Sequence, residues 1–136
     1  LGLIQFERYP EMLTKRKKMI EKMDAAFADI NVTVLNHYGK NHASSGHLYI
    51  VRLLGKTREQ TNKIIEMMAE RGIATNVHYK PLPMMTAYKK MGFDIKDFPN
   101  AYHMFENEIT LPLNTKMTME DVDYVIADFV DIVKSF

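Results

Sequence analysis

The chain has 136 residues, of which 46% are hydrophobic and 26% charged, a balance typical of one globular domain with one core. Its 18 basic and 17 acidic residues give a net charge of +1, which argues against a protein that binds nucleic acid. It has no cysteine, which excludes disulfides and thiolate metal sites, and it shows neither a membrane-spanning run nor a signal-peptide pattern. We therefore expect no nucleic-acid partner, no membrane contact and a cytoplasmic location.

The first predicted element is a long helix. Pro10 suits the first turn, where its missing N–H costs nothing. The basic run at residues 15–18 is interpreted as a solvated face, because Glu21 and Asp24 follow at helical spacing. An apolar stripe predicts the buried side of this helix, and its members are Leu13, Ile20, Met23, Phe27 and Ile30.

Two strands are predicted next. Residues 31–35 are rich in β-branched side chains, and residues 47–54 alternate so that one side carries His47, Tyr49, Val51 and Leu53. Between them, residues 36–46 contain Gly, Asn and Ser and predict an irregular stretch.

A second helix follows the second strand. Thr57 and Gln60 have the spacing of a capping box, and Gly72 suits the position after the last turn. Residues 73–77 then predict a strand, which would complete a β-α-β unit.

The C-terminal part predicts short elements and then a long helix. Pro81 and Pro83 interrupt regular structure, and the short elements are a helix at 84–90, a helix at 99–107 and a strand at 108–111. Thr118 and Asp121 can cap the last helix, whose apolar side is Val122, Val125, Ile126, Phe129, Ile132 and Val133. The fold class is therefore α/β, a small sheet with helices packed on it and a long helix at each end.

The polar end of the 73–77 segment is the main candidate site. His78, Tyr79 and Lys80 place an imidazole, a phenol and an ammonium side by side, just before a stiff proline turn. Polar groups held in this way can face a cleft. A strand whose polar end simply meets water is the alternative, and the residues alone leave both open.

Other constellations give no site. His37, His42 and His47 recur every five residues, a step that fits neither one helix face nor one strand face, so we expect no metal. Ser44 and Ser45 lie near His47, but no orienting acid is close in sequence and a catalytic triad is not expected.

Several segments together resemble one enzyme family. The segment Gly72-Ile-Ala-Thr-Asn-Val-His-Tyr-Lys-Pro-Leu82 is similar to a signature of the DegT/StrS-type aminotransferases. Further segments follow in the family's order, and they begin at Leu1 (LGLIQFER), Ser44 (SSGHLYIVR), Tyr88 (YKKMG), Phe98 (FPNA), Ile109 (ITLPL) and Met117 (MTMED). The resemblance covers nearly the whole chain.

The resemblance implies that residues 1–136 are a single C-terminal domain of a larger enzyme that depends on pyridoxal phosphate. The small domain of fold-type-I aminotransferases has a small, mostly antiparallel sheet, and we expect that fold here. In the family, the lysine that binds the cofactor and the groups that hold its phosphate lie in the N-terminal domain. We therefore expect no catalytic and no cofactor-binding residue on this chain, and no activity of the chain alone.

The resemblance also implies a substrate, a nucleotide-linked keto-sugar aminated for surface polysaccharides or amino sugars, with glutamate as the usual donor and a homodimer as the assembly. His78 and Tyr79 are implied to face the substrate, with Lys80 in the same turn, and Ser45 and His47 as further candidates. One departure is Pro83, which stands where the family commonly has a second histidine, so the polar contact of that position is lost.

Two alternatives remain at this point. The chain could be a stand-alone ligand-binding module, or it could belong to a family member that acts as a sugar dehydratase. Leu1 rather than Met opens the chain, so we expect a piece of a longer protein. The sequence encoded before Leu1 would separate these possibilities, whereas the particular sugar and nucleotide are not specified by the residues.

Overall fold

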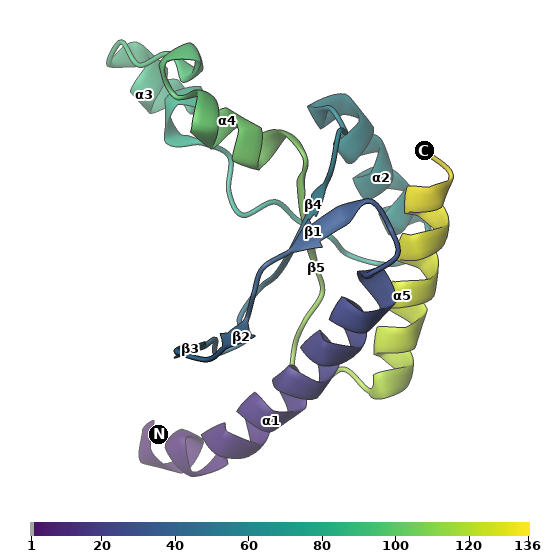
Figure 1. The fold of residues 1–136 in the computed structure, drawn as a ribbon. Helices are drawn as coiled ribbons and strands as arrows, with labels where there is room; N and C mark the ends of the chain where they lie inside the picture. The colour runs from purple at the N-terminus through teal and green to yellow at the C-terminus, as the bar shows by residue number, and fades with distance from the viewer. Residues whose placement is uncertain (1) are drawn as a thin grey trace.

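The computed structural model describes residues 2–136, and Figure 1 shows their arrangement. Long helices stand at both ends, as predicted. Two short 3-10 turns lie at Leu82–Met84 and Ile95–Asp97. The helices and strands are α1 Gly2–Phe27, β1 Val32–Val34, β2 Tyr38–Gly39, β3 His42–Ala43, β4 Tyr49–Leu53, α2 Arg58–Glu70, α3 Thr86–Lys90, α4 Pro99–Glu106, β5 Glu108–Leu111 and α5 Met119–Lys134.

The main sheet has three strands in the order β1-β4-β5, and both neighbours of β4 run antiparallel to it. Val51 marks the register, because it pairs with Val34 on one side and with Ile109 on the other. Figure 1 shows α2 and α5 at one side of this sheet, while the segment with α3 and α4 extends away from it. The predicted fold class, an α/β domain with a small antiparallel sheet, is confirmed.

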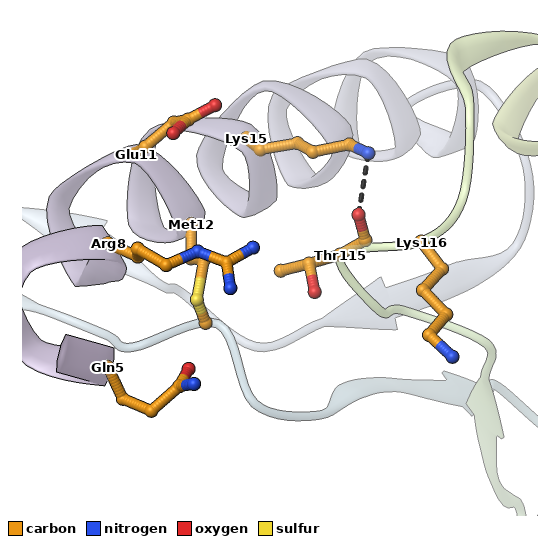
Figure 2. Close-up of a pocket in the computed structure, with 7 residues that line it drawn as sticks. All are labelled: Gln5, Arg8, Glu11, Met12, Lys15, Thr115 and Lys116. Carbon is orange, nitrogen blue, oxygen red and sulfur yellow. Dashed lines mark hydrogen bonds between the residues drawn. The ribbon is translucent and has the colours of Figure 1, made fainter. Parts of the chain in front are cut away.

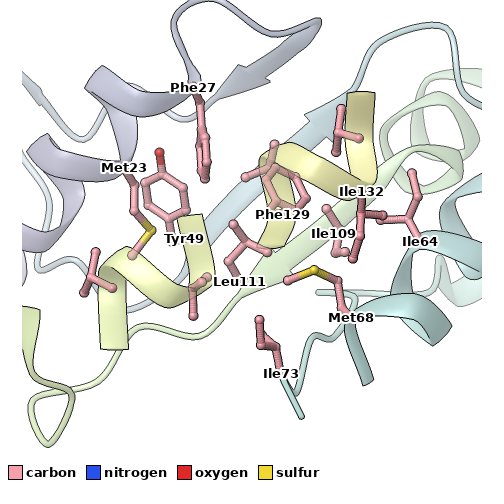
Figure 3. Packing of buried hydrophobic residues seen from close by; sticks show 14 of the residues in the cluster. Met23, Phe27, Tyr49, Ile64, Met68, Ile73, Ile109, Leu111, Phe129 and Ile132 are labelled. Carbon is pink, nitrogen blue, oxygen red and sulfur yellow. The ribbon is translucent and has the colours of Figure 1, made fainter. Parts of the chain in front are cut away.

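The core lies between the sheet and the helices. Alternation along β4 buries Tyr49, Val51 and Leu53, as the sequence pattern predicts. The rings of Phe27 and Phe129 meet here with their centroids 5.0 Å apart. Figure 3 shows how side chains from α1, α2, α5, β4 and β5 pack together with Ile73, which follows α2. The residues it labels are Met23, Phe27, Tyr49, Ile64, Met68, Ile73, Ile109, Leu111, Phe129 and Ile132.

Both predicted helix starts are confirmed in detail. Thr57 and Gln60 form a complete capping box at α2, and Thr118 and Asp121 form another at α5. After α2 the chain turns at Gly72 with φ of 74°, a left-handed conformation that a side chain disfavours. The elements most securely read from sequence are thus those with a local chemical signal at their ends.

The predicted position of Pro10 is wrong. Helix α1 begins at Gly2, so Pro10 lies inside it rather than in its first turn. A proline at this place removes the N–H that would bond to the carbonyl of Phe6. Because the helix is solvent-exposed from Gly2 to Glu11, water can satisfy that carbonyl, and the helix continues.

The predicted strand at 73–77 is also wrong. Only Asn76 joins the sheet, through an isolated antiparallel bridge to Thr110. The next two N–H groups are taken by side chains instead, since Val77 donates to Oδ1 of Asn76 and His78 donates to Oε2 of Glu108. β5 is antiparallel both to β4 and to this segment, so the segment runs parallel to β4 as the β-α-β prediction required.

Two further stretches differ from the prediction. Residues 36–46 are not irregular throughout, because β2 and β3 pair as a small hairpin with Tyr38 opposite Ala43. The helix predicted at 84–90 is divided into a 3-10 turn at Leu82–Met84 and the short α3. Within residues 2–136, no helix is long and apolar enough to cross a membrane.

Candidate functional site

The two faces of the β4–β5 pair differ in chemistry. Tyr49, Val51 and Leu53 face the helices, so the alternate residues of β4 lie on the other face. Residues paired across two strands share a face, and Ile50 pairs with Thr110 while Arg52 pairs with Glu108. The face turned away from α2 and α5 therefore carries Ile50, Arg52, Glu108 and Thr110, and we name this the open face.

His78 is held against the open face by two hydrogen bonds. Its backbone N–H donates to Oε2 of Glu108 at 3.0 Å, and its ring Nδ1 lies 2.9 Å from the hydroxyl of Thr110. The Tyr79 ring stands edge-on to the imidazole with centroids 4.7 Å apart, and the peptide bond between the two residues is cis. The half-buried imidazole is thus fixed by the neighbouring strand rather than by a strand of its own.

Tyr79 and Lys80 point outward. The Tyr79 side chain is 73% exposed and Lys80 is exposed as well, so a phenol and an ammonium are available to a ligand beside His78. The structure brings these three predicted residues together at one edge of the open face.

An apolar pocket of about 350 Å³ adjoins this segment. Pro81 and Pro83 line it together with the rings of Tyr88, Phe93 and Phe98. Pro83, the departure from the family pattern, therefore contributes an apolar wall where a histidine would add a polar group.

Ser45 and His47 lie at the other end of β4. His47 is exposed and lines a hollow of about 360 Å³ together with Leu35, Ser44 and Ile50. The exposed Ser45 does not line that hollow, and its carbonyl accepts a hydrogen bond from Arg16 at 3.3 Å.

Gly46 fixes the backbone conformation of the loop that carries Ser45 and His47. Its φ is 62°, and an added Cβ would come within 2.9 Å of Cδ1 of Ile20. Both the left-handed backbone and the close approach to α1 require glycine here.

Strand pairing links the surroundings of His47 to those of His78. Ile50 lines the hollow beside His47, and its cross-strand partner Thr110 contacts the ring of His78. His47 and His78 are 31 positions apart in the sequence, and strand pairing brings their surroundings together.

Glu108 and Thr110 belong to the candidate site by their contacts with His78, and the sequence analysis did not predict them. Both are buried polar residues in a four-residue strand, at 4% and 6% exposure, and a carboxylate in so short a strand was the available signal. Thr110 donates to Oε1 of Glu108 at 2.6 Å. Burial lowers the pKa of Arg58, and the negative charge of nearby Glu108 partly opposes that shift.

The three histidines of the five-residue row are separated by the fold. His37 is buried with its ring stacked on Tyr49 at 5.9 Å, whereas His42 and His47 are exposed. Burial lowers the pKa of His37, partly opposed by the charge of Asp24, and burial together with a hydrogen bond to Asp24 raises the pKa of Tyr49. Among residues 2–136 no three His, Asp or Glu side chains gather as a metal site.

A second, more polar pocket of about 350 Å³ lies where α1 passes the loop between β5 and α5 (Figure 2). Lys15 crosses it and donates to the carbonyl of Thr115 at 2.6 Å. The basic run at 15–18 is thus partly a tertiary contact, while Lys17 pairs with Glu21 as predicted. The residues lining this pocket are Gln5, Arg8, Glu11, Met12, Lys15, Thr115 and Lys116.

Comparison with known proteins identifies the family of this chain. Residues 1–130 match the family model of the DegT/DnrJ/EryC1/StrS aminotransferase family, and the chain belongs to that family.

Three relatives show which members of the family the chain is similar to. A putative sugar aminotransferase from Streptococcus pneumoniae, Spr1654, is 48% identical, and its apo-form superposes with a TM-score of 0.95 over 98% of this chain and 34% of its own. The spore coat polysaccharide biosynthesis protein SpsC of Bacillus subtilis is 34% identical over 98% of this chain and 35% of its own length. The Helicobacter pylori aminotransferase PseC, involved in pseudaminic acid biosynthesis, is 29% identical with a TM-score of 0.85, over 99% of this chain and 36% of its own. The chain therefore spans about a third of the relatives that it matches.

Proposed function

We propose that this chain is the C-terminal domain of a pyridoxal-phosphate enzyme that transfers an amino group to a nucleotide-linked keto-sugar. The observation that carries the proposal is the match to the aminotransferase family over residues 1–130, together with 48% identity to the pneumococcal putative sugar aminotransferase. A transaminase acting on a UDP-linked dideoxy amino sugar in Helicobacter pylori, 28% identical over the whole chain, supports the same substrate class.

The open face is proposed to hold the sugar nucleotide. A nucleotide sugar carries a diphosphate, and the exposed Lys80 ammonium beside the Tyr79 phenol offers a cation and a donor to it. His78 is fixed next to them and can contact a polar group of the sugar. His47 and Ser45, at the far end of β4, are proposed as secondary contacts.

The cofactor is proposed to bind outside this chain. A pyridoxal-phosphate site needs a lysine amine that is sheltered from water and a cradle for the phosphate. No lysine within residues 2–136 is buried, so the described residues do not fit that group by themselves. Bound elsewhere in the enzyme, the cofactor would supply the chemistry of amino-group transfer, and the residues of this chain would orient the acceptor sugar.

Glutamate as donor, a homodimer and a cytoplasmic location complete the proposal. The putative sugar aminotransferase of Streptococcus pneumoniae is described in PLP and PMP forms, which supports a cofactor that carries the amino group between two substrates. Exposed apolar side chains near the start of α1, Leu3, Ile4 and Phe6, support an assembly that covers them.

The test is amination by the full-length protein. Purified enzyme with pyridoxal phosphate and glutamate is given UDP- and dTDP-linked keto-sugars, and products are measured by mass spectrometry. Replacement of the carbonyl oxygen by an amino group is the expected result. Loss of a sugar hydroxyl without amination would instead establish the dehydratase alternative, and no turnover of any keto-sugar would reject the substrate class.

A further inference from the structure

Glu108, Thr110 and His78 form a continuous hydrogen-bond chain on the open face. The hydroxyl of Thr110 lies 2.6 Å from Oε1 of Glu108 and 2.9 Å from Nδ1 of His78. The second oxygen of Glu108 accepts the backbone N–H of His78 at 3.0 Å. One carboxylate thereby holds both the backbone and, through a hydroxyl, the ring of the same histidine.

Both oxygens of Glu108 act as hydrogen-bond acceptors. The side chain is only 4% exposed, and each of its oxygens accepts one hydrogen bond, Oε2 from the N–H of His78 and Oε1 from the hydroxyl of Thr110. Arg58 supplies a nearby positive charge that interacts with it. In the bond between them, the Thr110 hydroxyl donates its proton to Oε1 of Glu108.

The direction of that bond decides the state of the imidazole. A hydroxyl has one proton, and since Thr110 gives it to Glu108, it can only accept from His78. Nδ1 of the ring must therefore carry a proton. In the neutral imidazole the other nitrogen, Nε2, is then an acceptor, and the structure records no hydrogen bond to it from residues 2–136.

We propose that Glu108 and Thr110 are positioning residues that hold neutral His78 in its Nδ1–H form and present Nε2 as a hydrogen-bond acceptor. The ligand group it selects is a donor, a hydroxyl or an amide N–H, and not an anionic oxygen. Its assignment to the sugar part of a nucleotide sugar rests on the proposed function. The diphosphate is left to Lys80, which is exposed on the same segment.

The state of the ring is measured directly by long-range ¹H–¹⁵N NMR of the ¹⁵N-labelled 136-residue chain, with His78→Gln identifying the signals. The spectra are recorded at about pH 8.5, roughly two units above the ordinary imidazole pKa, because the two nitrogens of a neutral imidazole are distinguishable. The expected result for the unaltered chain is a protonated Nδ1 and an unprotonated Nε2.

Three variants test the chain of bonds. Glu108→Gln keeps the shape, but its amide can donate to Thr110, which reverses the chain and moves the ring proton to Nε2. Thr110→Val removes the link and the preference for Nδ1–H, whereas Thr110→Ser restores it. Thr33→Val, on β1 and outside the hydrogen-bond chain, is the matched control, and circular dichroism checks the fold of every variant. A ring state unaffected by both Glu108→Gln and Thr110→Val overturns the inference.

Kinetics of the full-length enzyme test the ligand. Thr110→Val should lower kcat/KM for the nucleotide sugar by about three- to tenfold, the usual effect of one lost neutral hydrogen bond, with Thr110→Ser close to the unaltered enzyme. The variants could change the protonated nitrogen of His78 as expected and yet leave the kinetics of the nucleotide sugar unchanged. If the unaltered enzyme aminates the sugar, that result would overturn the ligand assigned to His78 and not the proposed function. Failure of amination with a responsive ring state would reject the proposed function alone.

Discussion

The two faces of the β4–β5 pair show how one short sheet serves two purposes. The helix-side face is sealed by apolar side chains from α1, α2 and α5, with Tyr49, Val51 and Ile109 each at 0% exposure. The open face buries polar groups instead, Glu108 and Thr110, and uses them to fix His78. Burial of apolar area stabilises the helix-side face, whereas satisfied hydrogen bonds fix the positions of the side chains on the open face. Substitutions on the two faces should therefore separate stability from recognition.

The largest effect on stability is expected from a substitution on the helix-side face. Phe129→Ala removes a fully buried ring that packs on Phe27, and it should lower the free energy of unfolding by about 3–5 kcal/mol. Chemical denaturation measures the loss. Tyr124→Ala on the same helix, half exposed with one hydrogen bond to the carbonyl of Arg71, is the control and should cost about 0.5–1.5 kcal/mol. Equal losses for the two variants would contradict the contrast.

Helix α1 also has a buried part and an exposed part. Its second half is buried at Met19 and Met23, but Leu3 and Phe6 are 83% and 73% exposed, and Leu1 lies outside the described residues. We expect this chain to self-associate with increasing concentration, and Leu3→Ser with Phe6→Ser to weaken association by at least about tenfold, since each buried apolar side chain contributes about 1.5–3 kcal/mol. Analytical ultracentrifugation is the measurement. If the exposed pair Met91→Ser and Met104→Ser abolishes association instead, the interface lies on the α3–α4 segment.

On the open face, His78→Ala in the full-length enzyme should impair the sugar half-reaction. The loss of one polar contact is worth about 0.5–1.5 kcal/mol if the partner is neutral and about 1.5–3 kcal/mol if it is charged, or a few-fold to about a hundred-fold in kcat/KM. Stopped-flow kinetics should show the glutamate half-reaction much less affected, and His42→Ala, an exposed histidine, provides the control. Unchanged sugar kinetics with a large loss of thermal stability would make His78 a structural residue.

The smallest effect is a pH dependence at the rim of the core. Burial lowers the pKa of His37, so the unfolded chain binds its proton more readily than the folded chain. The contribution of His37 to stability is therefore complete above the unfolded pKa of about 6.5 and is lost as pH falls below that value toward the folded pKa. Melting temperatures are measured between about pH 7.5 and 5. The melting temperature should fall less with decreasing pH for His37→Phe, which keeps the stacking on Tyr49, than for His42→Asn. The same dependence of melting temperature on pH in both variants would exclude this contribution of His37.

Sequence alone determined the elements whose signals are local. The capping boxes at Thr57 and Thr118, the left-handed Gly72 and the alternation of β4 are all present as predicted, because each depends on residues within a few positions of one another. The family, too, could be read from segments in order along the chain.

Tertiary structure decided the features that depend on neighbours distant in sequence. A strand at 73–77 was a sound inference from its residues, but side chains of Asn76 and Glu108 took the N–H groups that a strand would have paired. Pro10 sits inside a helix because that part of α1 is open to water. The candidate site itself combines a loop after α2 with buried polar groups of β5, 30 residues further on. The composition of either segment could not reveal that contact, because strand register, which fixes which side chains meet, is set by the packing of the whole sheet.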